Sequence, residues 1–299
     1  MPLQRLARTS ESREKEEFLV EAMKDIPNAD REEYDTAKRE IPQLVSIESS
    51  PTKFLEVCGD SAPAAAARMA EYWKCRRSLF GDTTHKQLAV TTPGALNTSD
   101  VEVFDSGFFA VLPPDCRSDR YPVVCYDRSR LEEDFDDVNL LLSSMIRCAF
   151  YVLSVVTEDE MAQKKGFILL EINHGNFQPL PIDEPFRREL IRLTNSVLPL
   201  TLAHSHIVFK VPRGGQESYV SEHFGDTVLA IERLMKKDSF TVHCGIKKKQ
   251  ICHELEQNGF NREGLPVAVG GKIHSHHQKF YSRNQVNSHR YSLRHMEIL

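Results

Sequence analysis

The feature that most constrains the fold is an alternation of short, β-rich apolar runs with helical segments, which begins near residue 107. The apolar runs cover 107–112, 121–126, 167–172, 206–211 and 240–243, and the helical patterns cover 138–156, 184–197, 217–236 and 247–258. Strands that alternate with helices form crossover units, which favour a mostly parallel sheet flanked by helices. The strand cores are almost wholly apolar, as expected when both faces of a sheet are buried. The sequence therefore predicts an α/β fold.

The residues before this region have a helical pattern. Asp30 and Glu33 resemble a capping box that opens a charged helix, and Gly81 follows a long helical run as its stop signal. Residues 83–105 are rich in Thr, Gly, Asn, Ser and Asp, a composition typical of a linker or a loop-bearing segment. We therefore expect a small all-helical unit ahead of the α/β domain.

These patterns divide the chain into three predicted parts. A helical unit covers 1–82, the α/β domain covers 83–274, and 275–299 form a basic, loosely ordered tail without apolar periodicity. The apolar segment Val138–Val156 is interrupted by polar residues, so it reads as a buried core helix rather than a membrane span.

Composition indicates which class of partner the protein does not bind and in which cellular compartment it resides. The 299 residues include 38 Lys and Arg against 43 Asp and Glu, a net charge of −5, which argues against a wholesale nucleic-acid binder. Seven cysteines are an odd number without the spacing of a stapled scaffold, so free thiols in a reducing compartment are the simpler account. The N-terminus has no apolar run of a secretory signal. We predict a cytoplasmic protein, with peripheral contact at membranes.

Two patterns suggest chemistry around residue 244. His243-Cys244 follows a strand and precedes a helix, as in a cysteine phosphatase, but the position that needs an arginine to grip phosphate is Gln250. Cys252 and His253 add ligand types for zinc, although their spacing from the first pair is not that of a zinc knuckle. We therefore predict no catalytic residues, no metal and no cofactor, and hence a protein that is not an enzyme.

Two basic features remain. Lys247, Lys248 and Lys249 form a short run at a helix start, and the stretch from Lys272 to the last residue carries five further basic residues against a single acid. Either could contact anionic lipid headgroups, at roughly 1 kcal/mol per basic residue near the surface. A solvated surface explains both features equally well.

Four pieces of the sequence, in order, resemble one family. They are Phe54-Leu55 ahead of a helix that ends at 72–81, Met145–Tyr151 followed by Gly166–Ile172, Leu198-Pro199-Leu200 before a strand over 204–211, and Leu265-Pro266 with Gly270-Gly271. The set spans about 54–272 and resembles the CRAL-TRIO lipid-binding proteins, named for cellular retinaldehyde-binding protein and Trio.

This resemblance implies an apolar cavity between the sheet and helices, closed by a mobile gate helix at about 217–235. The residues expected to line that cavity are Phe150, Tyr151, Ile168, Leu170, Ile207, Phe209, Val220, Phe224, Val228 and Ile231. The last four recur at helical spacing, but plain core packing predicts the same stripe.

One departure from the family bears on the ligand. Members that bind phosphatidylinositol carry a Glu-Arg pair directly after the proline of the proline-led strand, where this chain has Leu200-Thr201. The resemblance therefore implies a less charged ligand, such as a sterol, a retinoid, a tocopherol-like molecule or a neutral phospholipid. We expect non-enzymatic binding of such a ligand, extending to transfer between membranes. The alternative is a regulatory or scaffolding module with a degenerate pocket that links a membrane to a partner protein.

Overall fold

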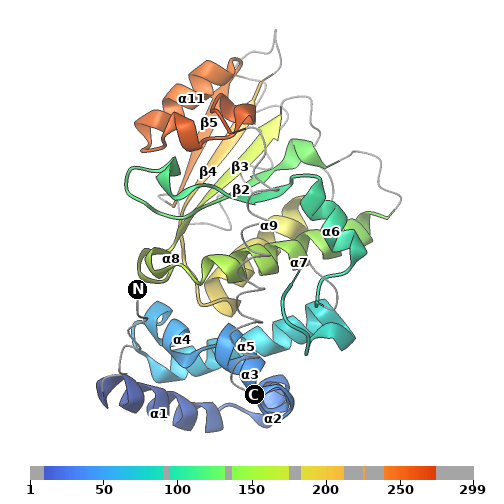
Figure 1. Cartoon of the computed structure of the whole chain (residues 1–299), viewed down its shortest axis with the longest axis vertical. Helices are drawn as coiled ribbons and strands as arrows, with labels where there is room; N and C mark the ends of the chain where they lie inside the picture. The colour runs from blue at the N-terminus through green and yellow to red at the C-terminus, as the bar shows by residue number, and fades with distance from the viewer. Residues whose placement is uncertain are drawn as a thin grey trace, which may run out of the picture. The chain divides into compact units, whose positions relative to one another are not determined.

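The computed structural model describes residues 10–89, 94–131, 137–174, 183–211, 225 and 239–273. By their contacts, the residues form two compact units (Figure 1). The first comprises Met1–His85 with Ser196–Pro199, and the second comprises Lys86–Asn195 with Leu200–Leu299.

The first unit is helical. Its helices are α1 (Ser10–Lys24), α2 (Asn28–Glu40), α3 (Pro42–Glu48), α4 (Pro51–Val57) and α5 (Ala62–Phe80). The long α5 packs against α1, α2 and α4 and ends at Gly81, whose φ of 51° suits glycine. The fully buried Arg76 of α5 is ion-paired with Glu48, and its guanidinium lies 5.3 Å from the Trp73 ring. A paired cation thus sits within the apolar core of this unit.

The predicted capping box at Asp30 is wrong. Helix α2 begins two residues earlier, at Asn28, and its N-cap residue Pro27 makes no side-chain capping hydrogen bond. A capping box does occur inside the predicted linker, where Asn97 and Asp100 bond each other's backbone amides and open α6 (Thr98–Asp105).

The second unit is built on a five-stranded sheet. Its strands are β1 (Phe109–Val111), β2 (Val123–Asp127), β3 (Phe167–His174), β4 (Leu202–Lys210) and β5 (Phe240–Gly245). They lie in the order β1-β2-β3-β4-β5, with β1 antiparallel to β2 and every other pair parallel. This mostly parallel sheet confirms the predicted α/β class.

Helices cover both faces of the sheet (Figure 1). Within the described residues, the helices of this unit after α6 are α7 (Val138–Val156), α8 (Glu160–Lys165), α9 (Asp183–Arg192) and α11 (Lys248–Gln257), and α9 continues into a π-helical turn at Leu193–Val197. Helices α7 and α9 contact each other on one face, and α11 lies on the opposite face. We call these the α7 face and the α11 face.

Strand register assigns each side chain to a face, because residues paired across neighbouring strands share one. Phe186 of α9 packs on Phe109 and Tyr126, which defines the α7 face at β1 and β2. Register then carries this face from Tyr126 through Glu171 and Ile207. The residues that alternate with these point to the α11 face.

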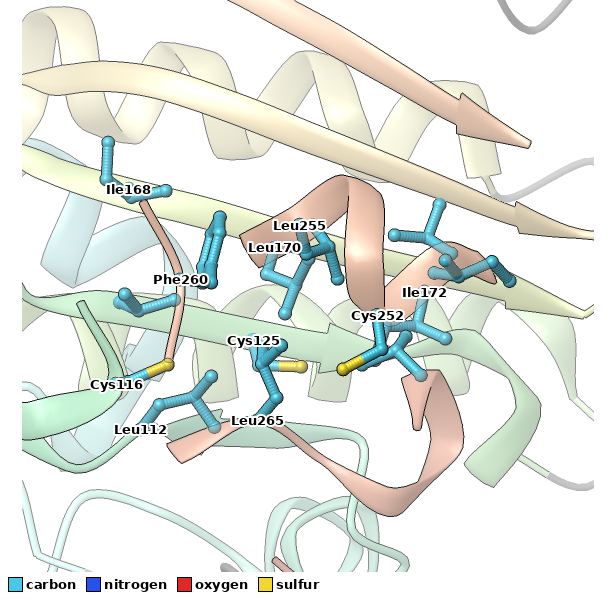
Figure 2. Packing of buried hydrophobic residues seen from close by; sticks show 14 of the residues in the cluster. Leu112, Cys116, Cys125, Ile168, Leu170, Ile172, Cys252, Leu255, Phe260 and Leu265 are labelled. Carbon is cyan, nitrogen blue, oxygen red and sulfur yellow. The ribbon is translucent and has the colours of Figure 1, made fainter. Parts of the chain in front are cut away.

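The α11 face holds a dense apolar cluster. Figure 2 shows Leu170 and Ile172 of β3 beside Leu255 and Cys252 of α11, and Ile168 of β3 belongs to the same cluster. All five residues are buried, with at most 4% of their surface exposed. This face is therefore part of the packed core.

The predicted Leu-Pro and Gly-Gly pieces meet in a tight loop beside α11. The amide of Gly271 donates to the Pro266 carbonyl oxygen (3.0 Å), and the amide of Ile273 donates to that of Leu265 (3.0 Å). A Cβ atom at position 271 would lie 2.0 Å from the Leu265 carbonyl oxygen, so only glycine fits here.

Helix α7 is the one described helix with the length and apolar composition to cross a membrane, with a mean hydropathy of 1.6. Half of this apolar stretch is buried within the protein, and α7 packs against α6, α9 and β1. Its bounds and its packing match the core helix that the sequence predicts.

Candidate functional site

The candidate ligand-binding surface is the part of the α7 face formed by β4 and β5. Ile207 and Phe209 of β4 point to this face and are each 1% exposed. Their register partners on β5, Val242 and Cys244, are only half-buried, and so is Phe240. The outer strand thus presents a row of apolar side chains that its surroundings cover incompletely. We call these five residues the apolar row.

The structure separates the predicted cavity residues. Ile168 and Leu170 lie on the α11 face, packed in the cluster of Figure 2, whereas Ile207 and Phe209 lie on the α7 face. Side chains on opposite faces of a sheet cannot line one cavity. The structure therefore does not bring these four residues together.

Of the other six predicted residues, two are described. Phe150 and Tyr151 are buried in α7, and the Tyr151 ring packs edge-on against Phe104 of α6 at 5.4 Å. Four residues of the predicted gate, Val220, Phe224, Val228 and Ile231, lie outside the described residues, as does the predicted tail 275–299.

A buried ion pair, which sequence analysis missed, shares the α7 face with the apolar row. Glu171 of β3 pairs with Arg187 of α9 and accepts a hydrogen bond from the side-chain amide Nδ2 of Asn173 (3.0 Å). Burial would raise the pKa of Glu171, but the adjacent Arg187 guanidinium outweighs it and the pKa is lowered. The charges of Glu171 and Arg187 thus satisfy each other, and this part of the face is neutral.

Leu200 and Thr201, which replace the family's Glu-Arg pair, directly precede β4. Leu200 is fully buried, and the Thr201 carbonyl oxygen accepts the amide of Phe167 (3.0 Å). Neither side chain carries a charge that could hold an inositol phosphate.

The predicted membrane-contact lysines occupy the turn from β5 into α11. Lys247 and Lys249 are exposed, next to Ile246, which is 42% exposed. Lys248 differs, because its ammonium group donates to the Val267 carbonyl oxygen (3.0 Å) and is half-buried. The structure therefore leaves two of the three lysines directed to solvent.

Register places His243 and Cys244 on opposite faces of β5. They therefore do not form a joint nucleophile and base, which a phosphatase-like site would need. Within the described ranges, no three His, Cys, Asp or Glu side chains converge where a metal ion could sit.

A hydrogen-bonded pair of histidines, which the sequence analysis also missed, lies on the α11 face. His206 Nδ1 lies 2.9 Å from His243 Nε2, and His243 Nδ1 lies 3.6 Å from a Glu254 carboxylate oxygen. Burial, then the neighbouring His243, lowers the pKa of His206 to about 3. Burial, then His204, lowers that of His243 to about 4. Both rings are therefore neutral near pH 7.

No protein-family model matches the sequence. No curated protein matches it either. Among solved structures, the chain is similar to the crystal structure of Sfh5. The TM-score is 0.46 and the identity 8%, over 88% of this chain and 98% of the other.

Proposed function

We propose that this protein binds a hydrophobic ligand or lipid, without catalysing a reaction on it, in an apolar cavity on the α7 face of its sheet. The observation that carries the proposal is the apolar row, where Phe240, Val242 and Cys244 remain half-buried beside the buried Ile207 and Phe209. Apolar side chains left partly uncovered at the edge of a core are a favourable surface for an apolar ligand.

Sheet topology supports placing the gate over this row. The connections from β2 to β3 and from β3 to β4 run through α7 and α9, on the α7 face. Strand β5 continues the sheet in the same direction, and right-handed crossovers in one direction lie on one face. The gate proposed at 217–235 belongs to the connection between β4 and β5, so we place it over the apolar row.

Burial of an apolar ligand would supply enough binding free energy for a lipid carrier. Removing a few hundred Å² of apolar ligand surface from water stabilises a complex by on the order of 10 kcal/mol before the costs of association. The neutral Glu171–Arg187 pair beside the apolar row favours an uncharged ligand over a phosphoinositide. Opening of the gate at a membrane, which the exposed Lys247 and Lys249 contact, would release the ligand.

The test is native mass spectrometry of protein purified under mild conditions, with extraction and identification of the bound lipid. The perturbing variant is Val242→Trp, which enlarges a half-buried side chain of the apolar row. Its control is Thr241→Trp, on the adjacent residue, which points to the other face. We expect Val242→Trp to lower lipid occupancy and Thr241→Trp to retain it.

Circular dichroism establishes that both variants are folded. If the wild-type protein neither co-purifies with lipid nor takes it up from vesicles, the cavity is degenerate. The alternative, a scaffolding module between a membrane and a partner protein, would then account for the fold.

A further inference from the structure

A groove of about 360 Å³ runs along α11, on the side of the sheet away from the apolar row. Its lining includes Lys247, Lys249, Cys252, His253, Glu256 and Arg262. Lys249, His253 and Glu256 lie four and three residues apart, on one side of the helix. Arg262 comes from a separate 3-10 turn (Arg262–Gly264), which follows α11. The groove thus combines side chains from two elements.

The charge of this groove is positive. Lys247, Lys249 and Arg262 carry permanent positive charges, against the single carboxylate of Glu256, which lies 3.8 Å from His253 Nδ1. The Nε of Arg262 donates to the Gly270 carbonyl oxygen (3.3 Å), which positions the guanidinium at the groove. A net charge of about +2 within one small groove matches a phosphate dianion.

An exposed aliphatic residue adjoins these cations in the chain. Ile246, 42% exposed, directly precedes Lys247 in the connection between β5 and α11. An aliphatic residue flanked by lysines is the arrangement of a surface that enters the interface of an anionic bilayer. A soluble phosphate compound offers no apolar surface for the Ile246 side chain to contact, so the presence of Ile246 favours a lipid as the ligand.

We propose that the groove binds the phosphomonoester headgroup of a membrane phospholipid, while Ile246 inserts beside it into the bilayer interface. The guanidinium of Arg262 supplies a two-pronged donor for the phosphate oxygens, and the two ammonium groups neutralise its second charge. The inference rests on the membrane step of the proposed function but is independent of the cavity, which lies on the other face of the sheet.

The test measures binding of the full chain to phosphatidylcholine vesicles that contain either phosphatidic acid or phosphatidylserine at equal total negative charge. We expect tighter binding to phosphatidic acid, because its phosphomonoester approaches a dianion. The triple variant Lys247→Ala, Lys249→Ala, Arg262→Ala should bind on the order of 100-fold more weakly and lose this preference. Ile246→Ser should weaken binding to both vesicles alike, by about tenfold.

The matched control replaces Lys164 and Lys165, two exposed lysines on α8, with alanine and should retain the preference. Equal binding to the two vesicles, or an unchanged triple variant, would overturn the proposal. Calorimetry measures the affinity of the protein for inorganic phosphate. If that affinity equals the affinity for vesicles, the groove binds a soluble phosphate compound and the proposal is overturned. Val242→Trp should bind vesicles like wild type, which separates failure of the cavity from failure of the groove.

Discussion

Acidification should destabilise the α/β unit through the buried histidine pair. His206 and His243 are each 3% exposed, and their ring nitrogens share one hydrogen bond, which requires one donor and one acceptor. Few negatively charged groups near the two rings could stabilise their protonated forms. Arg117, and His204 when it is protonated, add positive charge near His206, and within the described residues the nearby acids are Asp119 and Glu254. Protonation of both rings would remove the acceptor and bury two cations.

The magnitude follows from linkage. An unfolded histidine has a pKa of about 6.5, whereas those of His243 and His206 are about 4 and about 3 in the folded state. Because the unfolded chain binds protons first as the pH falls, stability is fully present above about pH 6.5 and is lost below it. Each ring costs about 1.4 kcal/mol per pH unit, so at about pH 5 the pair together costs about 4 kcal/mol.

The assay is urea unfolding of the full chain at a series of pH values, with circular dichroism as the signal that reports unfolding. The double variant His206→Leu, His243→Leu removes both titrating rings, so its unfolding should depend less on pH between about 6.5 and 5. The control is Val208→Ala, which creates a cavity at a fully buried residue of the same face. It should lower stability at every pH and leave the slope unchanged.

Two results would refute this reasoning. If wild type and the double variant lose stability with the same pH slope, the pair does not take up protons on unfolding. If the ring resonances of His206 and His243 titrate near pH 6.5 in the folded protein by NMR, their pKa values are not lowered.

Three further predictions concern other parts of the second unit. Cys244 should give no phosphatase activity, because its loop lacks the required arginine; turnover of an aryl phosphate that Cys244→Ser abolishes would contradict this. Arg187→Leu should cost about 3–5 kcal/mol of unfolding free energy by leaving the buried Glu171 charge unpaired, and Glu171→Gln in the same chain should recover part of the loss in urea titrations. Gly271→Ala should lower the thermal midpoint, at a cost of about 1–3 kcal/mol, because its Cβ would lie 2.0 Å from a carbonyl oxygen; an unchanged midpoint would show that the loop relaxes.

Much of the fold could be predicted from sequence because local patterns encode it. Helix α7 has the same bounds, Val138–Val156, as the helix that the sequence predicts, since its apolar residues lie between the polar flanks Asp137 and Glu158. The five strands fall where the β-rich runs predict them, although β4 begins earlier, at Leu202. Helix α6 was missed even though its signal, Asn97 with Asp100, was present in a segment whose composition indicates a linker.

The candidate site depended on information that local patterns do not contain. When both faces of a strand are buried, aliphatic residues occupy both, so composition cannot say which face takes Ile168 and which takes Ile207. Register decides it, and the register shifts between Phe167 and Ile168. A shift of one residue moves a side chain to the opposite face. The sequence by itself determined the order of strands and helices, because propensity and periodicity are local. Only the tertiary structure decided which side chains meet, because the pairing of distant strands and the presence of Lys247 and Arg262 in one groove depend on contacts between segments far apart in the chain.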